Sequence, residues 1–270
     1  MLYNKFPQSQ PFVFERCNRI AEDKDCAIPS HYHNLFEVYY IESGNCSYFI
    51  DNKAYHLEPG DIILIPEGII HNTLYKEHTS STRLLVNCTR RYIPRSAEAI
   101  FSKNNYLYRN HDISGELLEI LKQIEKEFSS CDTFSDDAMR SYMHLFFIKM
   151  SRNENQYDEK NSQSSYIEEA IDYIQKNLSS EIFLSDIAKH FSVSTEHFSR
   201  KFKKETGFGF CEYVNLLRLK RAESLLKHQE NMTVSQVAAE CGFSDSNYFS
   251  VKFKKMYNIS PRALQKLSGE

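Results

Sequence analysis

Four polar side chains near the carboxyl end of the chain have the chemistry needed to read base pairs in DNA. They are Glu196, Ser199, Arg200 and Lys203. Phe198 and Phe202 lie four residues apart among them, so they share the opposite face of a helix, which we expect to be core. The major groove is about 12 Å wide and admits one helix; Arg can bridge guanine N7 and O6, and Glu can accept from cytosine N4. The pattern predicts a short helix with polar side chains on its exposed face, as a helix that recognises bases in the major groove requires.

The same landmarks recur 50 positions later, and 51 positions later after one inserted residue. The first copy contains Ile187-Ala188-x-x-Phe191-x-Val193-Ser194, then Phe198 and Phe202-Lys203-Lys204. The second contains Val237-Ala238-x-x-Cys241-Gly242-Phe243-Ser244, then Phe249 and Phe253-Lys254-Lys255. Any amphipathic helix pair gives one such pattern for structural reasons alone. Two matched copies, with lysines suited to phosphate contacts, favour DNA recognition.

Capping residues predict the ends of these helices. In the first copy Ser194 is a suitable N-cap, and Thr206-Gly207 closes the helix that follows it. In the second copy Thr233-x-x-Gln236 forms a capping box, and Ser244 or Asp245 caps the next helix. Each copy therefore reads as helix, tight turn, helix.

At these residues the carboxyl-terminal part resembles the AraC/XylS-type DNA-binding domain. The match runs through Ala238-x-x-Cys241-Gly242-Phe243-Ser244-Asp245-x-x-Tyr248-Phe249-Ser250-x-x-Phe253-Lys254-Lys255, then Ser260-Pro261, and in the first copy through Phe198–Gly207. The resemblance covers about a hundred residues, and it implies two helix-turn-helix units joined by a long helix at about 210–226. It also implies that the recognition helices enter successive major grooves on one face of DNA. The candidate DNA-binding residues are Ser194, Thr195, Glu196, Ser199, Arg200, Lys203, Ser246, Asn247, Ser250 and Lys254.

Two positions depart from that family's pattern. A basic residue is common at position 251, where this chain has Val251, so Ser246, Asn247 and Ser250 are the candidates for base contacts in the second helix. The usual Gly before the Ser-Pro turn is replaced by the Tyr257-Asn258 stretch. Because Asn tolerates the left-handed conformation, we expect the turn to be kept.

A histidine-rich constellation lies in the amino-terminal part. His31-Tyr32-His33-Asn34-Leu35-Phe36-Glu37 precedes Gly44, and Gly60-x5-Pro66-x-Gly68-x2-His71 follows. These segments resemble the two cupin motifs, although position 25, where a Gly is expected, holds Asp25. The resemblance implies a small jelly-roll barrel, and in enzymes of that fold the residues matching His31, His33, Glu37 and His71 hold a divalent metal. Imidazole and carboxylate ligands suit Fe, Mn, Ni or Zn.

Three interpretations of these four residues remain open. They hold a divalent metal, they shape or hydrogen-bond a small-molecule effector pocket, or they are structural histidines. The effector pocket, with or without a metal, is the interpretation that we favour, because AraC-type regulators often keep His-x-His and a Glu in a sensor barrel. No other cofactor is indicated. Tyr32, Tyr39, Tyr48 and Phe49 could line the pocket, although aromatic residues on strands usually belong to the core.

The elements that position these residues follow from the hydrophobic period. Residues 11–95 carry β-rich runs at 38–41, 46–50, 62–65 and 83–87, separated by turn sequences. From 113 to 151 the apolar period becomes helical, which predicts an antiparallel helix pair. We expect the stripes of this pair to pack on each other and on the barrel, and the pair also to dimerise the chain. Residues 152–165 are polar and aperiodic, as in a linker.

An α+β multidomain fold is therefore predicted. It consists of a cupin-like barrel at 1–95, a helical pair at 96–151, a linker at 152–165 and an all-α double helix-turn-helix domain at 166–270. The length of 270 residues suits two domains.

Composition bounds the class of protein. The net charge is −3, but the part from Ser165 onward carries 15 Lys+Arg against 13 Asp+Glu, whereas the first 164 residues carry 18 against 23. No apolar run is long enough for a membrane helix, and no secretory signal is visible. The odd number of Cys, 7, without a C-x-x-C pair argues against a disulfide framework and for a reducing cytoplasm.

The sequence thus predicts a cytoplasmic transcription regulator, activator or repressor, that binds double-stranded DNA. A small molecule, with sugars among the candidates, would control it from the barrel, and its partners would be a second copy of the chain and RNA polymerase. The alternative is a metal-dependent cupin enzyme, a dioxygenase or isomerase, with an attached helical domain. The duplicated helix-turn-helix argues against an enzyme, and phosphate-loop, G-x-S-x-G and H-E-x-x-H motifs are lacking.

Overall fold

The structure, a computed structural model, describes residues 10–19, 28–51, 53–74, 79–101, 106–153, 155–156, 165–228 and 232–268. Cys26, Asn52 and most of the predicted linker lie outside these ranges. The chain divides into two compact units, Met1–Gln163 and Ser164–Glu270. None of the helices among the described residues has the length and apolar character that crossing a membrane requires.

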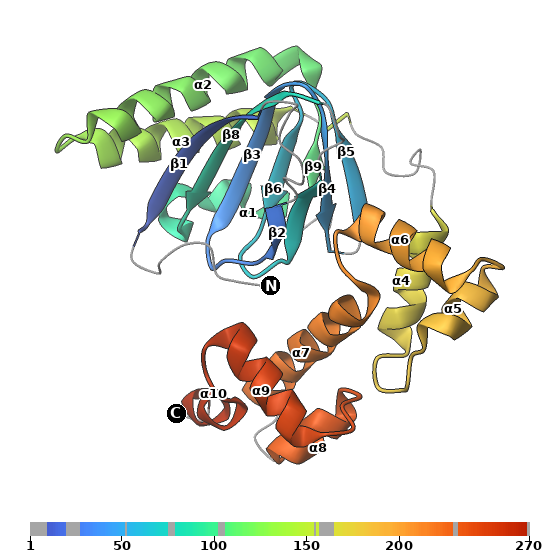
Figure 1. Ribbon diagram of the computed structural model, residues 1–270. Helices are drawn as coiled ribbons and strands as arrows, with labels where there is room; N and C mark the ends of the chain where they lie inside the picture. The colour runs from blue at the N-terminus through green and yellow to red at the C-terminus, as the bar shows by residue number, and fades with distance from the viewer. Residues whose placement is uncertain are drawn as a thin grey trace. The chain divides into compact units, whose positions relative to one another are not determined.

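The first unit is built on two antiparallel sheets (Figure 1). One sheet has the order β1-β8-β3-β6-β9, with β1 Phe12–Arg19, β8 Ser81–Cys88, β3 Phe36–Ser43, β6 Ile62–Ile65 and β9 Leu107–Tyr108. The other has the order β2-β7-β4-β5, with β2 Ile28–His31, β7 His71–Leu74, β4 Cys46–Ile50 and β5 Lys53–Leu57. The four predicted strand runs fall within β3, β4, β6 and β8, whereas β1, β2, β5, β7 and β9 were not predicted as strands.

Side chains of the larger sheet alternate between two cores. On the inner face, Tyr39, Ile63 and Leu85 pack with Tyr48 and Tyr55 of the smaller sheet. The outer face packs against two helices, α2 (His111–Ser130) and α3 (Ser135–Arg152), which lie along that face in Figure 1; its residues are Val38, Tyr40, Ile62, Leu64, Leu84 and Val86. The short α1 (Glu98–Phe101), with the 3₁₀ turns Arg90–Tyr92 and Arg95–Ala97, connects β8 to the rest of this layer.

The predicted helix pair is confirmed as packing on itself and on the barrel. Its apolar stripe is buried in the same cluster as the outer face of the sheet, through Leu117, Ile120, Leu121, Ile124, Met139, Met143, Phe146, Phe147 and Met150. Among the apolar side chains left exposed on these helices and their connection are Phe134, which is 75% exposed, and Leu145, which is 42% exposed. The apolar stripe is therefore buried within the first unit and is not available to a second copy of the chain. Dimerisation stays a prediction.

The second unit is all helical among its described residues. Its helices are α4 Tyr166–Lys176, α5 Leu184–His190, α6 Thr195–Thr206, α7 Phe210–His228, α8 Val234–Glu240, α9 Ser246–Tyr257 and α10 Pro261–Ser268. The pairs α5–α6 and α8–α9 are the two predicted helix-turn-helix units, and α7 is the predicted long helix. Phe198, Phe202, Phe249 and Phe253 are fully buried, as expected.

The two turns are closed by matching backbone contacts. Val193 N donates to Ala188 O at 3.0 Å, and Phe243 N donates to Ala238 O at 2.9 Å, 50 positions later. Each turn contains one residue with positive φ, Ser192 at 55° and Gly242 at 83°. The repeat seen in the sequence is thus a repeat of backbone geometry.

The predicted caps are confirmed. Ser194 accepts from His197 N, Thr233 and Gln236 form the capping box, and Asp245, rather than Ser244, caps α9. At the other ends, Gly207 and Asn258 adopt the left-handed conformation, with φ of 75° and 58°. Asn258 therefore ends α9 in the way that Gly207 ends α6.

Gly242 lies where two segments of the second unit approach each other closely. A Cβ there would lie 2.3 Å from Leu178 O and 2.9 Å from the Arg218 guanidinium. Arg218 of α7 in turn donates to Leu178 O and Ser180 O, which ties the segment after α4 to the second turn. Close backbone approach and positive φ both require Gly at this position.

We predict that Gly242→Ala destabilises the second unit by at least about 1–3 kcal/mol, because a side chain there is strained by its φ and meets backbone. Urea unfolding of the full chain, with hydrogen exchange of α8 and α9, measures it. Gly209→Ala is the matched control, since nothing lies within 4 Å of its added Cβ. Equal stabilities of the two variants would contradict the assignment.

Candidate functional site

The candidate DNA-reading face consists of equivalent positions on α6 and α9. Both helices are 12 residues long and begin 51 positions apart. The exposed positions of α6 are Glu196, His197, Arg200, Lys203 and Lys204. The exposed positions of α9 are Asn247, Tyr248, Val251, Lys254 and Lys255. The two helices thus present the same five positions, with different chemistry at the first three and lysines at the last two.

The candidate residues predicted from the sequence divide into exposed and engaged ones. Glu196, Arg200, Lys203, Asn247 and Lys254 are exposed on this face. Others are partly buried or bonded within their helix: Thr195, Ser199 and Ser246 are half-buried, Ser194 is the N-cap, and the Ser250 hydroxyl donates to Ser246 O at 2.8 Å. The exposed group offers the stronger candidates for base and phosphate contacts.

Sequence reasoning left three members of this face, His197, Tyr248 and Val251, without a predicted DNA contact. Tyr248 is 45% exposed and Val251 is 67% exposed. Neither was a candidate for base contact from the sequence, because both side chains are largely apolar. The offset of 51 residues between the two helices is the sequence feature that could have shown that Val251 occupies the position equivalent to Arg200.

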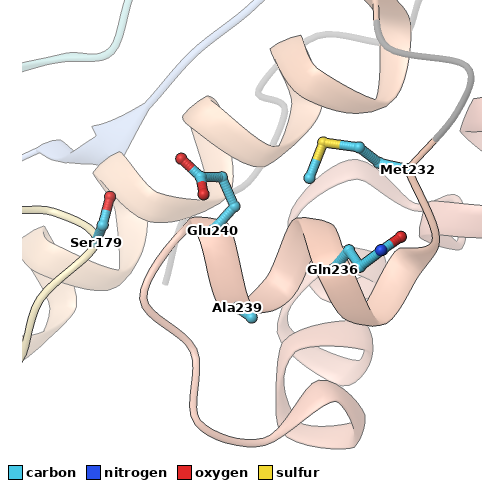
Figure 2. Close-up of a pocket in the computed structure, with 5 residues that line it drawn as sticks. All are labelled: Ser179, Met232, Gln236, Ala239 and Glu240. Atoms are coloured by element: carbon cyan, nitrogen blue, oxygen red, sulfur yellow. The ribbon is translucent and has the colours of Figure 1, made fainter.

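A hollow in the second unit lies beside α8 (Figure 2). It is lined by Ser179, Met232, Gln236, Ala239 and Glu240. Its polar groups are already engaged: Gln236 accepts from Thr233 in the capping box, and Arg221 of α7 donates to both Ser179 Oγ and Glu240 Oε1. This hollow therefore offers few groups to a ligand.

In the first unit, the four residues of the cupin-like motifs come together inside the barrel. His31 ends β2, His33 follows it, Glu37 lies on β3 and His71 begins β7. One potential ligand atom from each lies within 4.8 Å of the others. All four are at most 5% exposed.

Hydrogen bonds fix the orientation of two of these imidazoles. His33 Nδ1 lies 2.8 Å from Leu35 O, and His71 Nδ1 lies 2.9 Å from Ile69 O. Because a carbonyl oxygen only accepts, both Nδ1 atoms must carry protons. In the neutral rings, the Nε2 lone pairs then face inward, and metal-binding histidines are held in this same way by backbone carbonyls.

The inward atoms converge on one carboxylate oxygen. His33 Nε2 lies 3.0 Å from Glu37 Oε2, and His71 Nε2 lies 3.5 Å from the same oxygen. Burial raises the pKa of Glu37, but the His71 and His33 rings, in the charged form with protons on both nitrogens, outweigh it and hold the pKa well below its usual range. The neutral rings, with Nε2 lone pairs inward, are instead the form that binds a metal. Tyr48 donates to the other oxygen, Oε1, at 2.8 Å, and burial next to Glu37 raises the pKa of this phenol, which keeps its proton.

These residues fit a divalent metal. His71 Nε2 is fully buried and finds no hydrogen-bond partner among the described residues. Ligands about 2.0–2.2 Å from one metal are separated by roughly 3–4 Å, which matches the two distances to Glu37 Oε2. A cation among these atoms would satisfy the His71 lone pair and the carboxylate together.

A further polar group in the barrel was not singled out from the sequence. Asn87 on β8 pairs in register with Glu37 on β3, so their side chains share the inner face of the sheet. Asn87 is fully buried, and neither polar atom of its amide has a hydrogen-bond partner among the described residues. A buried amide without a partner beside the cluster offers a donor and an acceptor to a polar occupant. This position depends on strand register, which the sequence pattern does not reveal.

Comparison with known proteins supports both parts of the chain. A model described as an AraC-like ligand binding domain matches residues 17–142, and a model described as a helix-turn-helix domain matches residues 187–267. The chain is 24% identical over 249 residues to the HTH-type transcriptional activator RhaS of Escherichia coli strain SE11, which covers 88% of this chain and 87% of the relative. RhaS of Shigella dysenteriae serotype 1 matches with the same identity and coverage.

Solved structures also resemble parts or all of the chain. ToxT from Vibrio cholerae O395 is 20% identical, with 96% of this chain and 99% of that chain covered and a TM-score of 0.38. The DNA-binding domain of AdpA, solved in complex with a target DNA, is 23% identical, with 38% of this chain and 93% of that chain covered and a TM-score of 0.37.

We predict different losses for two changes on α6. Arg200→Ala should cost about 1–3 kcal/mol on a specific site and relax the preference at one base pair, because a bidentate base contact is lost. Lys203→Ala should weaken binding to every sequence and reduce the salt slope by about one, because a phosphate contact is lost. Fluorescence anisotropy at several salt concentrations measures both. Lys122→Ala, on α2 of the first unit, is the control; equal losses of Arg200→Ala on specific and random DNA would refute its role.

We predict that the untagged chain, freed of metal by a chelator, binds about one Co²⁺ in the barrel. His71→Ala should weaken this binding by at least 10–100-fold, the range that loss of even an outer-shell partner causes. Calorimetry and the visible absorption of bound Co²⁺ measure it. His56→Ala is the matched control, since His56 is exposed and bonds Ser47 Oγ. Unchanged Co²⁺ binding by His71→Ala would exclude the site.

Proposed function

We propose that this chain, which belongs to the AraC-type transcription regulators and carries their N-terminal sensor domain, binds a specific DNA sequence under the control of a small molecule held in its barrel. The single observation that carries the DNA part is the repeated polar face of α6 and α9, built twice on the same buried aromatic pairs. Like the activators that it resembles, the chain would activate transcription, with RNA polymerase as a partner.

The alternative, a metal-dependent dioxygenase or isomerase, is not favoured. The sensor model and the helix-turn-helix model together account for both units, and the relatives are transcription regulators. A metal among His31, His33, Glu37 and His71 would therefore serve sensing rather than turnover. We place this regulator in the cytoplasm, where its DNA target is accessible.

The barrel interior supports a polar effector. Glu37 and Asn87 of the larger sheet and Tyr48 of the smaller sheet offer acceptors and donors to the interior, and Asn87 has no partner among the described residues. Such groups suit a ligand rich in hydroxyl groups, such as a sugar, because each buried hydroxyl must find a partner. A divalent metal held by the histidine cluster would supply open positions for ligand oxygens.

The beginning of the predicted linker supports a route from barrel to DNA-binding unit. Gln156 N donates to Arg109 O at 2.7 Å, and Arg109 N donates to the Asn155 side chain at 2.9 Å. The Arg109 guanidinium makes two hydrogen bonds to Asp61, which is fully buried and immediately precedes β6. The residues that lead out of the first unit are therefore hydrogen-bonded to Arg109, which is in turn bound next to β6. Two residues of β6, Ile63 and Ile65, belong to the inner core.

An effector changes DNA binding only if it favours one arrangement of the chain over another. We propose that effector binding changes the hydrogen bonds that Asn155 and Gln156 make with Arg109. This change would alter how the DNA-binding unit is presented to DNA. Two copies joined through the exposed side of α2 and α3, which carries Leu145, would double the DNA footprint.

We predict that the purified full chain enriches a defined DNA sequence from a random pool at near-physiological ionic strength. The half-sites should be about 10–10.5 base pairs apart, one helical turn, because each chain carries two recognition helices. Sequencing of bound DNA, with and without a panel of sugars and divalent metals, measures it, and at least one additive should change the affinity. Enrichment of no sequence under any condition would overturn the proposed function.

A further inference from the structure

We propose that the second recognition helix, α9, recognises thymine through contact of Val251 with the 5-methyl group of the base. The inference rests on the proposed function, since it requires sequence-specific binding to DNA. It assigns different base chemistry to the two helices, with the polar α6 directed to G·C pairs and the less polar α9 to A·T pairs.

Position is the first argument. Arg200 lies six residues after the N-cap Ser194, and Val251 lies six residues after the N-cap Asp245. Each is exposed between a buried pair of phenylalanines on the far side of its helix. If α6 reads bases through Arg200, then α9, built on the same frame, directs Val251 into its own groove.

Exposure is the second argument. Val251 is 67% exposed, whereas Phe249 and Phe253 on the same helix are fully buried. Single exposed apolar residues are common and need no explanation. This one lies within a face that otherwise carries Asn247, Tyr248, Lys254 and Lys255, which suits a groove whose walls are phosphates and whose floor carries methyl groups.

The chemistry of the face is the third argument. In the major groove, thymine presents a 5-methyl group, which apolar side chains contact, and adenine presents N6 and N7, which Asn can bridge. Asn247 lies four residues before Val251, on the same face of α9. Val is restricted at χ1, so it loses little freedom on contact.

Tyr248 is less suited to this role than Val251. Its ring lies 6.4 Å from the Phe243 ring, and Lys252 Nζ lies 5.2 Å from its centre. It already packs within its own helix-turn-helix unit, and Val251 is the exposed apolar group that remains available to the base.

The test removes single methyl groups from DNA. In the sequence enriched by the full chain, each thymine of the half-site bound by α9 is replaced in turn by deoxyuridine, which keeps every hydrogen-bonding group. One replacement should weaken wild-type binding about fourfold, which corresponds to about 0.8 kcal/mol for a buried methyl-sized group. For Val251→Ala the same replacement should change affinity by less than about 1.5-fold, because the contact is already lost.

Two further variants sharpen the test. Val251→Arg should exchange the preference for thymine at that position for guanine, as a bidentate Arg requires. Leu267→Ala is the matched control, since Leu267 is 65% exposed on α10, and it should keep the wild-type response to deoxyuridine.

The outcomes separate this inference from the function on which it rests. A wild-type chain that binds its enriched sequence but ignores every deoxyuridine, or a Val251→Ala variant with the full fourfold response, overturns the thymine contact alone. A chain without any sequence preference overturns both. If Val251→Ala binds DNA with the wild-type affinity and the wild-type response to each deoxyuridine but fails to activate transcription, Val251 contacts a protein partner instead, and the inference is wrong.

Discussion

Burial of two aromatic rings, one helical turn apart, decides which side of each recognition helix can meet DNA. Phe198 and Phe202 of α6 stack at 5.8 Å, and Phe249 and Phe253 of α9 lie 5.6 Å apart, all fully buried. Each ring removes a large apolar surface from water, so rotating either helix about its axis would expose both rings at once. The remaining face, with its exposed polar and basic positions, is therefore presented in a fixed orientation.

The second unit was predictable from the sequence because its determinants are local. Ser194, Thr233 and Asp245 act within three residues of themselves, and the left-handed ends at Gly207 and Asn258 depend on single residues. The barrel was less predictable. Strand β7, His71–Leu74, buries polar residues, so no hydrophobic alternation marks it. The resemblance to the cupin motifs grouped His71 with Glu37, but the placement of Asn87 beside Glu37 depends on register between strands that are distant in sequence, which no local pattern specifies.

The histidine cluster shows how a barrel can hold a polar centre without loss of order. Two of the three imidazoles are each held by a carbonyl within two residues, Leu35 O for His33 and Ile69 O for His71, so their orientation is set before any occupant arrives. Tyr48 holds the carboxylate in turn. An occupant that satisfies His71 Nε2 and the Asn87 amide would remove the cost of leaving buried polar groups unpaired, which makes this interior responsive to its contents.

Net charge is a poor guide to the partner of this chain, and the ion pairs show why. Three acidic residues of the second unit are paired with basic residues outside the exposed positions of α6 and α9: Glu240 with Arg221, Glu223 with Lys227, and Glu205 with Lys201. Lys203, Lys204, Lys254 and Lys255 stay exposed on α6 and α9. Phosphates respond to charge within about a Debye length, some 8–10 Å, rather than to the total. A chain of net charge −3 thus keeps a cationic surface where its two recognition helices need one.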